Sequence, residues 1–202
     1  MKYILKYPIV SIIIKVIVYS GMVSGVYAAI RFDALYPMEE GYFGEVSITE
    51  IAQEIILFSL FLFYLLFRSK NIVIKPVTNI ISLFFLASLI RELNFLFDWW
   101  LYPVLLVIAL MIWLTIRDHK KLDDAVSVFF SLPSSAWLLA GFIVTFVFSR
   151  LFGQSDFWRI LYDDSSYRLA KAAVEEGTEL LGNVLMLISA VELSLAGLSV
   201  NK

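Results

Sequence analysis

Eight charged residues lie at or near the ends of long apolar runs, and they are the part of this sequence best suited to chemistry. Six are glutamates and two are arginines: Glu50, Glu54, Arg91, Glu92, Arg150, Glu175, Glu176 and Glu179. An ionisable group that borders hydrocarbon is costly unless it pairs with an opposite charge or meets water. Six carboxylates facing two guanidinium groups leave an excess of negative charge, which protonation, a bound cation or water must relieve.

The spacing of these acids places pairs of them on one face of a helix. Glu50 and Glu54 are four residues apart, as are Glu175 and Glu179. Two such pairs could supply hard oxygen ligands to a divalent cation. A di-iron bundle needs a Glu-x-x-His pattern instead, and the lone His119 lies in a charged run. We therefore predict no dedicated metal site and no cofactor.

A purely structural role explains the same residues differently. Acids at helix starts complement the helix dipole, and Arg91 then only fastens neighbouring helices together. The chain has no cysteine and no serine paired with a histidine, so we predict no catalytic residue and a non-enzymatic protein.

One local pattern has a counterpart in a known family. The Glu175-Glu176 pair resembles the paired glutamates of CAAX-prenyl-protease-like membrane proteins. That motif continues with an arginine and with histidines on later helices, whereas this chain has Leu180 at the corresponding position and no later histidine. A lipid- or isoprenoid-processing activity is therefore the least supported class.

A second charged pair is expected deeper in the apolar runs. At 1.5 Å per residue, Lys15 lies about 10 Å along a helix from Pro8, and Glu192 lies about 12 Å from Val200. Matching depth and opposite sign predict an intramembrane salt bridge between Lys15 and Glu192, with the first and last helices as neighbours. In the alternative, Lys15 extends towards the headgroups on its own.

The composition points to the elements that must position these groups. Of 202 residues, 60% are hydrophobic and 17% are charged, so a lipid bilayer is the expected solvent. We predict an all-α, polytopic integral membrane helical bundle of about six transmembrane helices in a single domain, residues 1–202. The expected spans are residues 8–30, 51–67, 77–97, 100–116, 125–149 and 176–200.

Two boundaries are less sharply marked by the sequence. The segment 31–49 contains Pro37, two glycines and four acids, and it is typical of an exposed loop. Ser47 or Thr49 can cap the helix that follows. Pro133 leaves residues 122–131 either along the membrane surface or at the start of the fifth span.

The positive charges favour one orientation in the membrane. Most basic residues near the span ends fall on one side, including Arg68, Lys70, Lys75, Arg117, Lys120 and Lys121. The positive-inside rule then predicts a multi-pass protein of the cell inner membrane with both termini in the cytoplasm. The net charge of −2 and the absence of a basic tract argue against direct nucleic-acid binding.

These features support two hypotheses about function. The first is a membrane-embedded sensor or scaffold subunit that assembles with other subunits or with copies of itself. The chain is rich in Ile, Phe, Lys and Tyr, as AT-rich genes often encode. A horizontally acquired role, such as a component of a bacterial defence or stress module, is one setting for such a subunit. The alternative is a proton- or cation-conducting transporter or channel, with the glutamate cluster as its entry. Only Lys15, Asn183, Ser189 and Glu192 would then line the path farther in.

Overall fold

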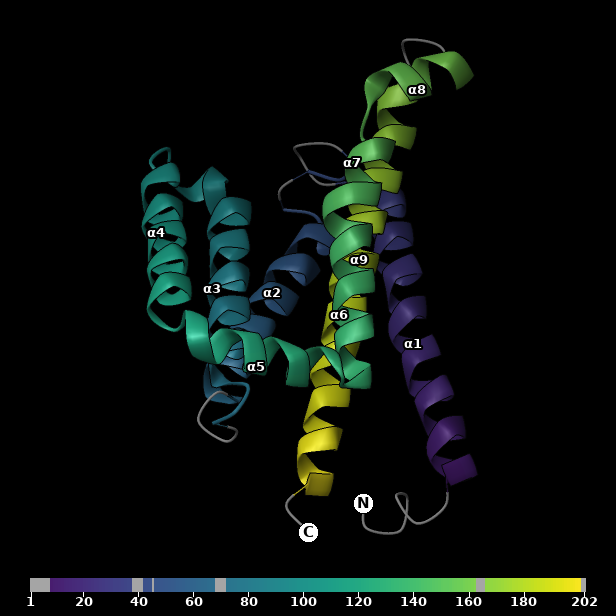
Figure 1. Ribbon diagram of the computed structural model, residues 1–202. Helices are drawn as coiled ribbons and strands as arrows, with labels where there is room; N and C mark the ends of the chain where they lie inside the picture. Colours follow the sequence, from purple (N-terminus) through teal and green to yellow (C-terminus); the bar gives the residue numbers. More distant parts are fainter. Residues whose placement is uncertain (1–7, 38–41, 45, 68–71, 163–165, 201–202) are drawn as a thin grey trace.

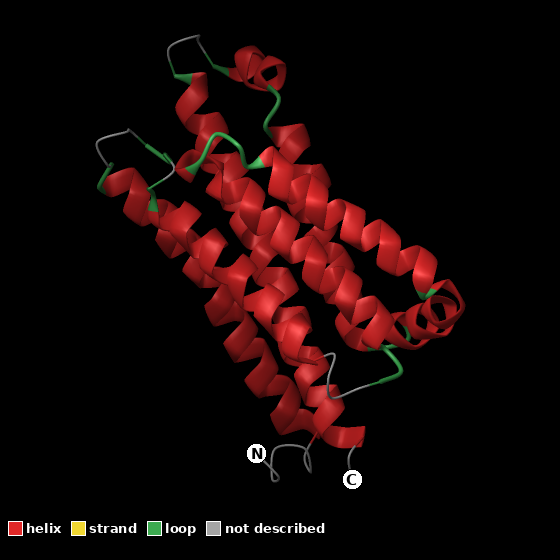
Figure 2. Cartoon of the chain, turned by 90° about the vertical axis from the view of Figure 1, so that its left-hand side faces the viewer, coloured by secondary structure: helices red, strands yellow, loops and turns green. Residues whose placement is uncertain are grey.

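The computed structural model describes residues 8–37, 42–44, 46–67, 72–162 and 166–200, with side chains described up to Ala196. Throughout this part of the chain the regular elements are helices, and no strand is present, so the predicted all-α class is confirmed (Figure 2). Five of the described helices are long and apolar enough to cross a membrane, or six if a bent pair counts as one span. These helices indicate a multi-pass membrane protein.

The first helix is longer than predicted. Helix α1 (Pro8–Leu35) passes the expected end at Ile30 and takes in the start of the segment predicted to be an exposed loop. The extra turn has a tertiary partner, because the buried Asp33 carboxylate binds the start of α2 (Ile48–Phe67). The prediction of an exposed loop over 31–49 was therefore wrong at its beginning.

The third and fourth helices form a hairpin beside α2 (Figure 1). Helix α3 (Lys75–Glu92) has a proline in its first turn and continues into a 3-10 turn, η2 (Leu93–Leu96). Helix α4 (Leu101–Arg117) returns to the other end of the hairpin. There the chain bends by 97° into helix α5 (His119–Phe130), which crosses the ends of the bundle.

The fifth span starts later than predicted. The sequence placed it at 125–149, but α5 ends at Phe130 and Leu132 is extended, with φ −82° and ψ 140°. The residue before a proline disfavours helical geometry, so the helix stops there. The span is instead built from α6 (Pro133–Ile143), a π turn labelled η3 (Val144–Phe148) and α7 (Ser149–Phe152).

The last helix is the centre of the molecule. Helix α9 (Tyr167–Val200) has 34 residues and begins nine residues before the predicted span at 176. It packs against α1, α2, α6, α7 and α8 (Ser155–Leu161), the last of which lies between the predicted spans 125–149 and 176–200 (Figure 1). Both described ends of the chain, at α1 and α9, lie at the same end of the bundle.

Helices α6 and α9 approach each other closely at two glycines. A Cβ atom added to Gly141 would lie 2.6 Å from the carbonyl oxygen of Gly182, and one added to Gly182 would lie 2.0 Å from Thr145 Oγ1. Small residues allow transmembrane helices to pack backbone against backbone, where dispersion forces replace the hydrophobic effect. This contact fixes the depth at which the polar side chains of α9 meet those of α6 and α7.

Candidate functional site

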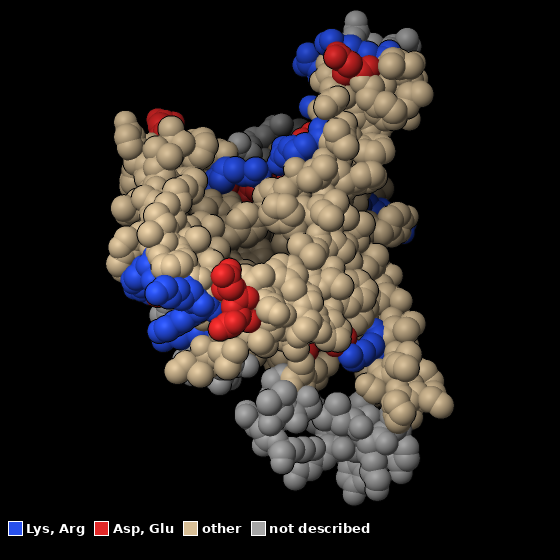
Figure 3. Space-filling view, viewed as in Figure 1, with Lys and Arg blue, Asp and Glu red and all other residues tan. Residues whose placement is uncertain are grey.

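The eight charged residues singled out from the sequence come together at the end of the bundle opposite the described termini. They belong to α2, α3, α7 and α9, and a band of basic side chains with acidic atoms beneath it marks the place on one face (Figure 3). Short apolar spans that alternate in direction bring their ends to a common depth. This group of Glu50, Glu54, Arg91, Glu92, Arg150, Glu175, Glu176 and Glu179 is called the outer cluster below.

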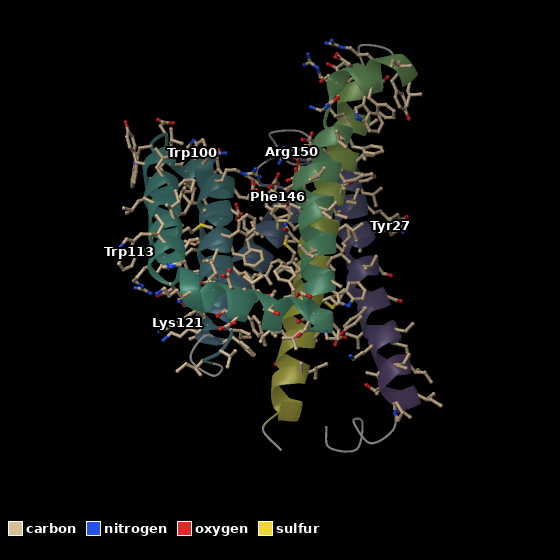
Figure 4. The ribbon with its side chains drawn as sticks, viewed as in Figure 1. Tyr27, Trp100, Trp113, Lys121, Phe146 and Arg150 are labelled. Atoms are coloured by element: carbon tan, nitrogen blue, oxygen red, sulfur yellow. The ribbon has the colours of Figure 1, made fainter. Side chains whose placement is uncertain are left out.

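Arg150 is the residue that joins two acids of α9. Its Nη1 atom lies 3.2 Å from Glu175 Oε1, and its Nη2 atom lies 2.6 Å from Glu179 Oε1 (Figure 4). The Glu179 side chain is only 5% exposed and also accepts a 3.2 Å hydrogen bond from Ser149 Oγ. Lys171 contributes a further cation, with its Nζ atom 3.6 Å from Glu175 Oε2.

Arg91 pairs within its own helix. Its Nη2 atom donates a hydrogen bond to the carboxylate of Glu92, the next residue. Glu92 is the acid in direct contact with Arg91, while Glu179 and Glu50 act on it at longer range. Arg91 therefore neutralises the charge of Glu92 directly. It acts on Glu50 of α2 and Glu179 of α9 only through longer-range electrostatic attraction.

Glu176 of α9 accepts a hydrogen bond from an amide side chain of α2. Gln53 Nε2 donates a 3.0 Å hydrogen bond to Glu176 Oε2, and the Glu50 carboxylate lies close enough to repel that of Glu176. Gln53 is 1% exposed and was not singled out from the sequence, although an amide inside an apolar span is a signal that could have identified it.

The outer cluster holds more acids than cations. Six glutamates face Arg91, Arg150 and Lys171, which leaves three acids in excess, and Glu54 is further repelled by Glu92. Within the described ranges, no group of three or more His, Asp or Glu side chains has a geometry that could hold a metal ion. Bound protons, a cation or water at the membrane face would each relieve this excess.

The inner charges meet as expected from the sequence. Lys15 Nζ of α1 lies 2.7 Å from Glu192 Oε2 of α9. Tyr19, one turn farther along α1, donates a 2.5 Å hydrogen bond to Glu192 Oε1. Helices α1 and α9 are therefore neighbours, and each carboxylate oxygen of Glu192 has a donor from α1.

Further polar side chains of α9 lie between the two charged regions. From the outer cluster, Asn183 Nδ2 donates to Gln53 Oε1 at 3.4 Å. Nearer the inner pair, Ser189 Oγ donates to Ser134 O at 2.7 Å and lies 3.5 Å from Tyr64 OH. Asn183 Oδ1 is buried and has no hydrogen-bond partner among the described residues. The interior of the bundle is thus more polar than the sequence indicated.

Asp33 is a buried polar residue whose role the sequence did not reveal. Its carboxylate accepts hydrogen bonds from the backbone N–H groups of Ile48 at 2.8 Å and Thr49 at 2.9 Å, and from the Thr49 hydroxyl. It therefore caps the N-terminus of α2 from a different helix, where a negative charge also complements the helix dipole. Ser47 caps the same turn locally, with Oγ 3.2 Å from Glu50 N.

A second overlooked feature is the Gly21-x-x-x-Gly25 pattern on α1. A Cβ atom added at either glycine would meet nothing within 4 Å, unlike at Gly141 and Gly182. Both α1 glycines lie on the exposed surface of the described bundle. In transmembrane helices this spacing is typical of a face on which a second helix packs.

Comparison with known proteins provides no relative for the chain. No family model, no curated protein and no solved structure matches it.

Proposed function

We propose that this protein is a non-enzymatic sensor or scaffold subunit of a larger membrane assembly, with α1 as the helix that contacts its partner. The partner is a transmembrane helix of another subunit or of a second copy of this chain. We place the protein in the cell inner membrane with both termini in the cytoplasm, and a bacterial defence or stress module is a setting consistent with this role.

The single observation that carries the proposal is the open glycine face of α1. Of the most apolar 18-residue stretch of α1, only 6% is buried within the bundle, compared with 56% of the corresponding stretch of α9. Gly21 and Gly25 are four residues apart on this exposed helix and have free space above them. A helix backbone can approach there closely enough to replace lipid by protein contacts.

The two attachments of α1 support the same proposal. Asp33 binds the start of α2 at one end of the helix, and Lys15 binds Glu192 of α9 towards the other. Two polar anchors separated along the helix fix its rotation as well as its position. The glycine face is therefore presented in a defined direction, as a docking surface requires.

The outer cluster gives this subunit a means of sensing. Its three excess acids make its charge depend on the protons or cations available at the membrane face. Glu175, Glu176 and Glu179 lie on α9, the helix that also holds α1 through Glu192. A change of charge in the outer cluster would therefore act on the helix to which α1 is attached.

Disulfide crosslinking in native membranes tests the partner-facing role of α1. The natural chain has no cysteine, so Ser24→Cys places one thiol beside the glycines. We expect it to form a covalent adduct, at twice the subunit mass for a second copy. Tyr27→Cys is the matched control, because Tyr27 is 67% exposed on the same helix but off the glycine face.

Bulky substitutions complete the test. Gly21→Leu with Gly25→Leu should abolish the Ser24→Cys adduct, whereas Val23→Leu, on an exposed position of the same helix, should retain it. Equal adduct yields from Ser24→Cys and Tyr27→Cys would mean that α1 meets other molecules only by random collision. The proposed partner face would then be wrong.

The orientation is testable with the same cysteine-free background. A cysteine at Tyr42 or Ser155 should react with an impermeant thiol reagent added outside intact cells, and one at Asp118 should react only after the membrane is opened. The reason is the asymmetric distribution of Lys and Arg. Reversed labelling would place the outer cluster on the cytoplasmic side.

The polar line along α9 favours a second candidate function, proton or cation conduction. It consists of Glu176, Gln53 and Asn183, which are joined by hydrogen bonds, and of Ser189 and Glu192 farther along the helix. Hydrogen-bonding groups and ionisable residues within a bundle are common features of ion pathways. Purified protein in liposomes with a pH-sensitive dye should then dissipate a proton gradient. Asn183→Leu should abolish that flux, and unchanged flux would exclude this path.

A further inference from the structure

A groove between α2, α3 and α4 is lined by both charged and apolar side chains, and it is distinct from the outer cluster. It has a volume of about 550 Å³, and its walls include four leucines together with Lys75 and Arg117. A neighbouring depression of about 340 Å³ shares Lys75 and Arg117 and adds Lys121. Both lie at the end of the bundle opposite the outer cluster, where the chain turns from α4 into α5 (Figure 1).

Leucines form most of the inner wall of the groove, and the Ser82 hydroxyl beside them donates to the Phe61 carbonyl oxygen at 3.2 Å. Leu65 of α2, Leu83 of α3, and Leu110 and Leu114 of α4 contribute to it. In a helical bundle such a crevice opens towards lipid, since α4 buries only Val107 among its side chains. Its chemistry suits a hydrocarbon chain.

The mouth of the groove is basic. Among the described residues that line it, Lys75, Arg117 and Lys121 face one acid, Asp118, which Arg117 binds through two hydrogen bonds of 3.0 Å and 2.6 Å. The Arg117 guanidinium also lies over the Trp113 ring, 4.5 Å from its centroid, which fixes its direction. The patch is visible as basic side chains near the α4–α5 junction, where Trp113 and Lys121 are labelled (Figures 3 and 4).

We propose that this groove binds one anionic phospholipid, with its phosphate between Lys75 and Arg117 and an acyl chain along the leucine wall. The charge excess at the mouth selects a negative headgroup. A basic opening next to an apolar crevice matches both parts of that molecule. A free phosphate would satisfy only the mouth, and a neutral lipid would satisfy only the wall. The site does not depend on the proposed partner role of α1.

The test uses the purified full-length protein in detergent. Native mass spectrometry measures lipid retained after addition of a phosphatidylglycerol or of a phosphatidylcholine with the same acyl chains. We expect selective retention of phosphatidylglycerol by the natural protein. Lys75→Gln with Arg117→Gln should reduce its affinity about thirtyfold, on the basis of the usual contribution of two cations near a headgroup.

Two matched variants separate a defined site from general attraction. Lys120→Gln removes a neighbouring charge that does not line either depression, so it should leave retention nearly unchanged. Leu83→Trp adds bulk to the apolar wall without changing charge, and it should reduce retention of phosphatidylglycerol. Melting temperature in phosphatidylcholine alone establishes that each variant is folded.

Three outcomes would overturn the proposal. Equal retention by Lys120→Gln and by the Lys75→Gln, Arg117→Gln double variant would show that the mouth is not selective. Equal stabilisation by inorganic phosphate and by phosphatidylglycerol would identify a soluble-anion site instead. If the folded Leu83→Trp variant retained the lipid fully, the acyl chain would not lie in the groove.

Discussion

Helices α1 and α9 lie side by side and both cross the bundle, yet their relations to the rest of the chain are opposite. More than half of the most apolar 18-residue stretch of α9 is buried, whereas only 6% of the corresponding stretch of α1 is buried. Both carry glycines, but Gly177 and Gly182 of α9 are covered and Gly21 and Gly25 of α1 are open. The same residue type therefore serves internal packing in one helix and leaves a free surface in the other.

The comparison shows what holds a peripheral helix in place. Val26 and Ala29 of α1 pack against Leu180, Val184 and Ile188 of α9, and this is a small apolar contact. Polar anchors near the two ends of α1 supplement it, namely Asp33 at the start of α2 and Lys15 at Glu192. Helix α1 is thus held by a few separate contacts, whereas α9 is surrounded by other helices on several sides.

The largest effect should come from filling the α6–α9 contact. In Gly182→Ala the new methyl group would overlap Thr145 Oγ1 and approach the Gly141 carbonyl oxygen at 2.8 Å, which is backbone and cannot rotate away. Overpacking of this kind costs about 3 kcal/mol. We expect a lower melting temperature in detergent and less folded protein in the membrane.

Gly177→Ala is the control for that substitution within α9. Its Cβ would meet Ile30 Cδ1 at 2.4 Å, the far end of a flexible side chain on α1. Ile30 can turn aside, so the loss of stability should be clearly smaller. Equal melting temperatures for the Gly177→Ala and Gly182→Ala proteins would contradict the close α6–α9 contact.

The outer attachment of α1 is expected to contribute the next largest effect. Asp33→Ala removes the acceptor of two backbone N–H groups and one hydroxyl at the start of α2, all in a buried position. Loss of an N-cap of this kind costs up to about 2 kcal/mol. Thermal unfolding in detergent measures it. Asp33→Asn retains an acceptor oxygen and should recover most of the loss, and no difference between the two variants would argue against capping.

The inner attachment should have a smaller effect, because Lys15 is partly exposed. Its side chain is 36% exposed, compared with 12% for Glu192. Lys15→Glu places two carboxylates together and should cost about 1 kcal/mol more than the swapped pair, Lys15→Glu with Glu192→Lys. Expression level and melting temperature should both recover in the swapped protein. Failure of the swap to recover either would show that the pair contributes no net attraction.

Much of this architecture follows from the sequence for a simple physical reason. Apolar length reports the number of helices that a bilayer can accommodate, and this gave the all-α class. Charge at a matching depth placed Lys15 opposite Glu192, because a lone charge in hydrocarbon must find a partner. The assembly of the outer cluster follows from the same reasoning about depth, whereas its function stays a prediction.

Other features depend on contacts between distant segments and were missed for that reason. Asp33 looked like a loop residue because its hydrogen-bond partners belong to the next helix. Gln53 gains its role from Glu176 and Asn183 of α9, 123 and 130 residues away. The break at Pro133 was local, but the neighbouring residues 125–130 are apolar enough to continue a span, so the boundary could not be chosen from hydropathy.

The smallest effect on the isolated chain is expected at the open glycine face. Gly25→Ala adds a methyl group with no atom within 4 Å, so it creates no clash. Alanine is also favoured over glycine in a helix by about 1 kcal/mol, and the melting temperature of the monomer should stay unchanged or rise slightly. The same methyl group lies where a partner helix would pack, so the crosslinking of Ser24→Cys should fall. A drop in monomer stability equal to that of Gly182→Ala would mean that this face of α1 is already covered within one chain.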